Sequence, residues 1–283
     1  MKKYVAVSDA FSEQYIGGAE LTTDAILHPC LDETIKINSH QVTTDFVTNN
    51  LDKTWLIFNF SKLKDDIKVQ IIKNVKYSII EYDYKFCDYR SMEKHLLITN
   101  QSCNCVEVGV EGKIKKLFYG YAEKIWFMSE PQRQTFLEQV LTIKEEKTEI
   151  LSSVFSAGDL RFIESVSNNE KNSNYLILKS NSWIKGTSEC VKYAEENSLD
   201  YELVSDLAYH ELIIKMSTSK GLIFRPLGGD TCPRIVIEAN LLGCDLILND
   251  NVQHKDEDWF STRNSCLEYL KNRTNIFWRF YEQ

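Results

Sequence analysis

The sequence has no long uncharged hydrophobic run, few prolines and no excess of basic residues. None of its apolar stretches approaches the roughly 18 residues of a membrane-spanning helix. Its start, MKKYVAVSDAFSE, becomes polar too early for a signal peptide. We therefore expect a cytoplasmic protein without a transmembrane segment. The formal net charge of -8 argues against a protein that binds nucleic acid mainly by neutralising phosphates.

The eight cysteines are expected to be free thiols, because disulfides are rare in cytoplasmic proteins. Four side chains could together form a Cys3His zinc site: Cys87, His95, Cys103 and Cys105. However, a single residue separates the last two cysteines, whereas zinc knuckles usually have two to four residues between their ligands. We therefore favour a chain with no metal site, and keep zinc as the alternative.

The pattern of the chain predicts an α/β protein with two domains. With 283 residues and 43% hydrophobic content, the chain can form two cores of ordinary size. Short apolar runs alternate with amphipathic helices, which indicates parallel sheets. We predict a first domain over 1–155, a polar linker over 156–174, a second domain over 175–265 and a C-terminal helix over 266–283, whose aromatic residues could instead form a self-association surface. Residues 91–121 show no clear pattern.

One stretch, residues 221–251, predicts a complete βαβ unit. GLIF reads as a strand, RPLGGDTCP as a loop, and the next residues as a helix that starts near Pro233 and ends at Gly243. Residues 246–248 supply the second strand. In such units, ligands bind beyond the carboxyl ends of the strands, next to helix N-termini. Asp230 lies there, where it could cap the helix or contact a ligand.

The spacing of two acids in this stretch is the strongest motif. Seven residues separate Asp230 from Glu238, and Ala239 and Gly243 follow. This pattern resembles the retaining nucleotide-sugar glycosyltransferases of family four, whose signature is Glu, seven residues, Glu, then Ala and a Gly. The resemblance implies a GT-B fold, in which two Rossmann-like domains with parallel sheets face each other across a cleft. It also implies that the C-terminal helix returns to the first domain.

The resemblance assigns roles to these residues. It implies that Asp230 and the backbone amides of Thr231 and Cys232 bind the donor sugar, and that Glu238 binds the ribose of the nucleotide. The aspartate replaces the first Glu of the family signature, which keeps the charge but shortens the side chain by one methylene. Without the resemblance, Asp230 reads as a helix cap and Glu238 as a solvated helix residue.

A second family feature is the pair Lys185 and Gly186, just before a predicted helix. In the family, an Arg and this Lys bind the donor diphosphate. Ser180 takes the place of the Arg, so a different cation has to complete the site; the candidates are Lys179, Arg225 and Arg234. Taken without the family, a Lys-Gly pair is more often a surface turn.

The first domain offers candidates for the acceptor side. Gly17 and Gly18 open a helix in the sequence GGAE, with which many family-four enzymes also begin, and the resemblance places them in the cleft near the donor phosphates. Asp83, Tyr84 and Arg90 follow a predicted strand and could contact acceptor hydroxyls, or could form an ordinary charged loop.

Together these features predict a metal-independent retaining glycosyltransferase that needs no cofactor and uses a nucleotide-sugar as its donor. The acceptor would be a hydroxyl of a saccharide, lipid or small molecule, and Asp230 and Lys185 would be the residues closest to the chemistry. Two alternatives remain open. One is a non-catalytic sugar- or nucleotide-binding protein of the same fold, and the other is a glycosyltransferase of nucleic-acid bases, against which the acidic charge argues.

Overall fold

The computed structural model of the chain describes residues 2–282. The chain divides into two compact units, Met1–Ser152 and Ser153–Gln283. The boundary lies close to the predicted end of the first domain at residue 155. Residues 1 and 283, at the outer ends of the predicted first domain and C-terminal helix, lie outside the described residues.

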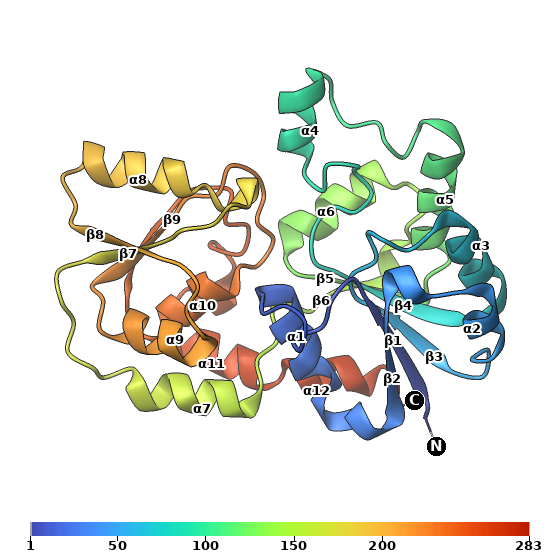
Figure 1. Cartoon of the computed structure of the whole chain (residues 1–283), viewed down its shortest axis with the longest axis horizontal. Coiled ribbons are helices and arrows are strands. Elements are labelled where there is room, and N and C mark those ends of the chain that lie inside the picture. Colours follow the sequence, from blue (N-terminus) through green and yellow to red (C-terminus); the bar gives the residue numbers. More distant parts are fainter. Residues whose placement is uncertain (1, 283) are drawn as a thin grey trace. The chain divides into compact units, whose positions relative to one another are not determined.

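The first unit is built on a six-stranded parallel sheet in the order β2-β1-β3-β4-β5-β6 (Figure 1). The strands have these bounds: β1 Tyr4–Ser8, β2 Thr34–Asn38, β3 Thr54–Ile57, β4 Lys76–Glu81, β5 Lys124–Phe127 and β6 Thr148–Ile150. The central strands are almost continuously apolar and buried because helices cover both faces of a parallel sheet.

Helices connect these strands. They are α1 Gly18–Leu27, α2 Thr44–Thr48, α3 Asp65–Asn74, α4 Met92–Thr99, α5 Gly109–Gly120 and α6 Glu130–Gln139. All of them except α4 bury apolar side chains. The predicted start of a helix at Gly18 is confirmed, and Ser129 caps α6 as expected by accepting a hydrogen bond from the N–H of Gln132. The region without a clear pattern, 91–121, contains α4 and α5.

The core of the first unit is rich in aromatic rings. Phe136 of α6 contacts four of them, with ring centroids 4.9 to 5.9 Å apart: Tyr84, Phe86, Tyr119 and Phe127. Edge-to-face and offset pairs of this kind add to the burial of apolar area. This cluster holds the loop after β4 against α5 and α6.

The second unit contains a four-stranded parallel sheet in the order β10-β9-β7-β8. Its strands are β7 Tyr175–Leu178, β8 Tyr201–Val204, β9 Gly221–Phe224 and β10 Asp245–Leu248. Its helices are α7 Ala157–Val166, α8 Thr187–Glu196, α9 Tyr209–Ser217, α10 Arg234–Leu241, α11 Arg263–Lys271 and α12 Arg273–Arg279. The predicted βαβ unit is confirmed as β9, α10 and β10, with Gly243 in the left-handed region at φ 69° just after the helix.

The predicted linker at 156–174 is wrong in its first half, where α7 forms. Ser156 and Asp159 make a reciprocal capping box, and Leu160 and Ile163 place a buried stripe on one side of the helix. Helix α7 packs against α9, α10 and α11 of its own unit. The polar composition that indicated a linker belongs to the exposed side of this helix and to the residues that follow it.

The predicted C-terminal helix is two helices, α11 and α12, which meet at Asn272. The expectation that this end of the chain returns to the first domain stays a prediction. Among residues 2–282, no helix has the length and apolar character needed to span a membrane.

Candidate functional site

Three loops of the second unit meet beyond the carboxyl end of its sheet. They follow β7, β9 and β10, and backbone hydrogen bonds join them: the N–H of Leu227 donates to the carbonyl of Ile184 at 3.1 Å. Asn249 and Asn251 both donate their side-chain amides to the carbonyl of Pro226. The loops therefore form one connected platform at the sheet edge where parallel α/β proteins bind ligands.

Gly186 is required by the close approach of two of these loops. Its φ of 60° is in the left-handed region, and a Cβ there would collide with the backbone carbonyl oxygen of Arg225. Helix α8 begins at the next residue, Thr187. The first-turn N–H groups of a helix have no partners within the helix, so the platform lies against an N-terminus suited to an anion.

Lys185 and Asp230 meet on this platform. The ammonium nitrogen of Lys185 lies 2.7 Å from Oδ2 of Asp230, although 44 residues separate them in the chain. The lysine side chain is 29% exposed and the aspartate 13% exposed, so the pair remains open to solvent on one side. Lys185 also lies 5.5 Å from the centroid of the Phe224 ring, which fixes its direction further.

The backbone of Asp230 is held independently of its side chain. Its N–H donates to the carbonyl of Asn251 at 2.8 Å, and its own carbonyl accepts from the N–H of Gln253 at 3.1 Å, which makes a parallel bridge with Val252. Asp230 does not cap α10, contrary to one of the two sequence interpretations, because α10 starts at Arg234 with Pro233 as its N-cap residue. Its carboxylate is directed to Lys185 instead.

Glu238 lies inside the second unit, with 3% of its side chain exposed. Its Oε1 is 3.4 Å from Nε of Arg234, one helical turn earlier, but makes no hydrogen bond within the described residues. Burial raises the pKa of Glu238, and the guanidinium of Arg234 opposes this effect. The acid is thus a buried partner of Arg234, with one oxygen that lacks a hydrogen bond.

Arg234 is not available to bind a diphosphate, so the prediction that it replaces the missing Arg is wrong. Its guanidinium donates to the carbonyl of Val154 and to the hydroxyl of Tyr209, and lies 3.8 Å from the centroid of the Phe155 ring. Thr231 and Cys232 are also buried, and the hydroxyl of Ser153 donates to the carbonyl of Cys232 at 2.7 Å.

Arg225, a second of the three predicted substitutes for the missing Arg, lies along α8. Its Nε is 3.6 Å from a carboxylate oxygen of Glu189, and its guanidinium is 4.3 Å from the centroid of the Tyr193 ring. Ser180 uses its hydroxyl locally, accepting a hydrogen bond from the N–H of Ser182. Lys179, directly after β7, is exposed. Lys185 is therefore the cation that contacts the platform's acid.

In the first unit, Gly17 lies between β1 and α1 as the N-cap residue, and Gly18 is the first residue of α1. Gly17 has an extended backbone with φ of −142°, so it is not needed for a left-handed turn. A Cβ there would lie 2.6 Å from Oε2 of Glu20 and 2.8 Å from the ring of Tyr15, so these two side chains would have to shift to admit one. Burial raises the pKa of Glu20.

A charged network occupies the loop after β4. The ammonium of Lys85 donates to Glu81 at 2.8 Å and to Asp83 at 3.1 Å, and the guanidinium of Arg90 pairs with Asp83. Glu81 and Lys85 are buried, whereas Arg90 is 45% exposed. Burial by itself would raise the pKa of Asp83, but Lys85 and Arg90 hold it below its usual value. Asp83 and Arg90 thus form a pair that faces solvent, next to the buried pair of Glu81 and Lys85.

Two residues of this edge correct or extend the sequence analysis. Tyr84 is 1% exposed and stacks on Phe136 in the core, so it cannot contact an acceptor as predicted. Asp9, which the sequence motifs did not point to, lies directly after β1 and accepts hydrogen bonds from the backbone N–H groups of Ser61 and Lys62. Its position at the end of a buried strand was the signal that could have identified it.

The four candidate zinc ligands come together in the same unit. Their ligand atoms all lie within 4.8 Å of one another. The fold thus brings the four side chains to one point, although a single residue separates Cys103 from Cys105.

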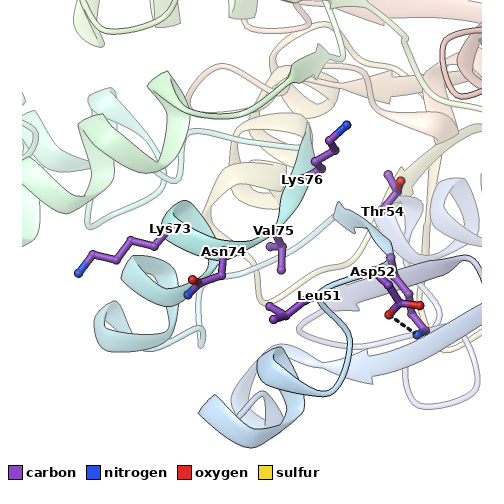
Figure 2. Close-up of a pocket in the computed structure, with 8 residues that line it drawn as sticks. Leu51, Asp52, Thr54, Lys73, Asn74, Val75 and Lys76 are labelled. Atoms are coloured by element: carbon purple, nitrogen blue, oxygen red, sulfur yellow. Dashed lines mark hydrogen bonds and ion pairs between the residues drawn. The ribbon is translucent and has the colours of Figure 1, made fainter.

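A separate surface depression of about 600 Å³ lies at the opposite edge of the first sheet. Figure 2 shows that it lies where β3 and β4 begin, with Lys73 and Lys76 pointing in different directions. Its other lining residues include Leu51 and Val75. No candidate residue lines it, and the amino edge of a parallel sheet is not where such folds bind ligands.

Comparison with solved structures decides the fold. Anabaena Alr3699/HepE in complex with UDP and glucose superposes with a TM-score of 0.57 at 11% identity, covering 99% of this chain and 95% of that one. The complex of the same protein with UDP-glucose gives the same values. The fold is GT-B. An alpha-glucosyltransferase in complex with UDP and a 13-mer DNA containing a central A:G mismatch gives 0.50 at 9% identity, covering 98% of this chain and 90% of that one.

No protein-family model and no curated protein sequence matches the chain. In terms of the GT-B fold, Lys185 and Asp230 lie at the carboxyl edge of the sheet of the second domain. Asp83 and Arg90 lie at the corresponding edge of the first domain.

Proposed function

We propose that the chain is a glycosyltransferase that transfers a sugar from a nucleotide-sugar to a hydroxyl acceptor with retention of configuration. The observation that carries the proposal is the contact between Lys185 and Asp230 on the platform beside the N-terminus of α8. A cation, an acid and helix amides at one point can bind a diphosphate and the polar groups of a sugar together. The GT-B neighbours in complex with UDP or UDP-glucose support UDP-glucose as the first donor to test.

In this proposal, Lys185 binds the diphosphate and stabilises the negative charge that develops on it as the bond to the sugar breaks. The ammonium is already directed by Asp230 and Phe224, so little reorganisation is needed. Asp230 accepts hydrogen bonds from sugar hydroxyls through the carboxylate oxygens that Lys185 leaves available. The hydroxyl acceptor would bind at the first domain, where Asp83 and Arg90 offer an acceptor and donors of hydrogen bonds.

The proposal keeps Glu238 as the contact of the ribose. Its buried Oε1 lacks a hydrogen bond, and an unsatisfied buried carboxylate oxygen is unfavourable by about 1–3 kcal/mol. A ribose hydroxyl that donates to this oxygen would supply the missing bond. Since the side chain is 3% exposed, this contact requires that the nucleotide, or a small movement of Arg234, open the site.

The first experiment is a calorimetric screen of UDP, GDP, ADP and CMP and of the corresponding nucleotide-sugars. Glu238→Gln keeps the shape of the side chain but removes its charge, and we expect it to weaken binding of the nucleotide about 10-fold. Glu238→Ala is less informative, because it removes one of the two acids that pair with the buried Arg234 and leaves a gap beside it. Equal nucleotide affinity of the wild type and Glu238→Gln would exclude the ribose contact.

The second experiment measures release of UDP from UDP-glucose in the presence of saccharide and lipid acceptors and of water alone. Lys185→Ala should lower kcat by about 10- to 100-fold, because a charge-assisted contact to the leaving group contributes about 1.5–3 kcal/mol. Lys192→Ala is the matched control, since its side chain lies on α8 and is 68% exposed. A Lys185→Ala protein with native turnover would refute the role of the lysine.

The same assays separate the alternatives. Binding of a nucleotide-sugar with no transfer to any acceptor and no hydrolysis would identify a non-catalytic binding protein. The anomeric configuration of the product, read by NMR, tests retention, and an inverted product would refute it. A nucleic-acid acceptor is not proposed, because the net charge of -8 provides no general attraction to phosphates.

A further inference from the structure

A long excursion of the first unit, residues 82–108, leaves the sheet after β4 and returns at α5. Cys87 lies before α4, His95 lies on α4, and Cys103 and Cys105 lie after it. Figure 1 shows α4, in the middle of this excursion, apart from the other helices of its unit. All three cysteines are free thiols.

The distances within this cluster match those of a tetrahedral zinc site. With Zn–S of about 2.3 Å and Zn–N of about 2.05 Å, a tetrahedron places sulfur and nitrogen about 3.6 Å apart and two sulfurs about 3.8 Å apart. Nδ1 of His95 lies 3.6 Å from Sγ of Cys87 and 3.5 Å from Sγ of Cys105. All four ligand atoms lie within 4.8 Å of one another, so small side-chain adjustments suffice to reach tetrahedral distances.

The packing of α4 gives an independent reason for a metal. A surface helix is normally held by an apolar stripe that faces the core. On α4, however, Leu96, Leu97 and Ile98 are 52%, 68% and 53% exposed. The buried side chain of this helix is His95, at 6% exposure. Met92, in the first turn of α4, is partly buried against the core. The most buried group of the helix is an imidazole whose Nδ1 faces two sulfur atoms.

We propose that Cys87, His95, Cys103 and Cys105 bind one zinc ion with a structural role. Three thiolates and one imidazole are a ligand set that favours zinc over the hard cations Mg²⁺ and Ca²⁺, which prefer oxygen. Four protein ligands close the coordination sphere, which is typical of structural rather than catalytic zinc. The ion joins the two ends of the excursion and fixes α4 between them.

The zinc site also positions Arg90, which lies between two of the ligands. The N–H of Arg90 donates to the carbonyl of Cys87 at 3.0 Å, and its φ of 56° is in the left-handed region, where a non-glycine residue is strained. The metal stabilises this turn and thereby the pair of Arg90 with Asp83. The metal site itself does not depend on the proposed function.

The test is the metal content of the full chain, purified under reducing conditions without chelators. We expect about one zinc per chain by plasma mass spectrometry. The Cys103→Ser/Cys105→Ser variant should lose the ion, whereas Cys30→Ser should keep it. Cys30 is the matched control, because it is a buried cysteine of the same unit outside the cluster.

A cobalt titration of the wild-type chain, after removal of metal by a chelator, keeps the test independent of whether the variant folds. A tetrahedral site with three thiolates gives intense visible bands and sulfur-to-cobalt charge transfer, with an end-point at one equivalent that zinc then abolishes. Two outcomes would overturn the proposal: a wild-type chain that neither contains zinc nor gives this spectrum, or a folded Cys103→Ser/Cys105→Ser variant that retains one zinc. A metal-free hydrogen-bonded cluster of thiols and imidazole would produce the first of these.

Discussion

His254, in the segment after β10, has a fully buried ring whose protonation opposes folding. The ring stacks on Trp259 with centroids 5.4 Å apart and contacts Phe260 edge to face at 4.6 Å. Neither ring nitrogen has a hydrogen-bond partner within residues 2–282. Burial lowers the pKa of His254 from 6.5 to about 3. The folded chain therefore holds this histidine neutral at pH values where the unfolded chain binds a proton.

The sign and size of the effect follow from linkage. Between pH 6.5 and about 3, the unfolded state binds more protons at this site, so the free energy of unfolding falls as the pH falls. At pH 5.0, which is 1.5 pH units below the unfolded pKa, the loss is about 2 kcal/mol, at about 1.36 kcal/mol for each unit. The full contribution is present above pH 6.5.

The assay is urea unfolding at pH 7.5 and pH 5.0, followed by tryptophan fluorescence, for the wild type and for His254→Phe. Phenylalanine keeps an aromatic ring against Trp259 but cannot bind a proton. We expect the decrease in the free energy of unfolding between the two pH values to be about 2 kcal/mol smaller in the variant than in the wild type. His28→Gln is the control, because His28 is exposed. Identical pH dependence of the wild type and His254→Phe would refute the reasoning.

Three further substitutions test the packing. Gly186→Ala should destabilise the second unit by about 2 kcal/mol or more, from the left-handed backbone and the collision with the carbonyl of Arg225, and an unchanged Tm would contradict this. Phe136→Ala should lower the free energy of unfolding by about 3–5 kcal/mol in a denaturant titration, since four rings contact it; a loss below about 1 kcal/mol would show that the cluster collapses into the gap. Ser156→Ala removes the capping box of α7 and should reduce stability by about 1 kcal/mol, whereas Ser156→Asp should restore most of it.

The order of strands and helices could be predicted from the sequence because it depends on local patterns. Short apolar runs bounded by turn residues, such as β9, are typical of buried strands, and a glycine such as Gly243 is typical of a helix end. The contact between Lys185 and Asp230 was also accessible, since both follow strands of one parallel sheet and the carboxyl ends of such strands meet at one edge.

Other features could not be predicted because they depend on contacts between distant segments. Nothing near Tyr84 in the sequence reveals that its ring stacks on Phe136, which comes from another helix. The surroundings of Glu238 likewise involve distant segments, because its partner Arg234 donates to the carbonyl of Val154 and the hydroxyl of Tyr209. Helix α4 has outward leucines and an inward histidine, which is the reverse of the pattern that sequence analysis uses to recognise a helix.

Under the proposed function, the bridge between Asp230 and Val252 makes this acid a suitable position for altering sugar selectivity. A carboxylate on a free loop can absorb a longer or shorter side chain by shifting its backbone. Here two backbone hydrogen bonds fix the Cα of Asp230. The added methylene in Asp230→Glu would therefore move the carboxylate farther from the backbone. If Asp230 binds the sugar as proposed, the shorter acid leaves a larger space for that sugar than a glutamate would.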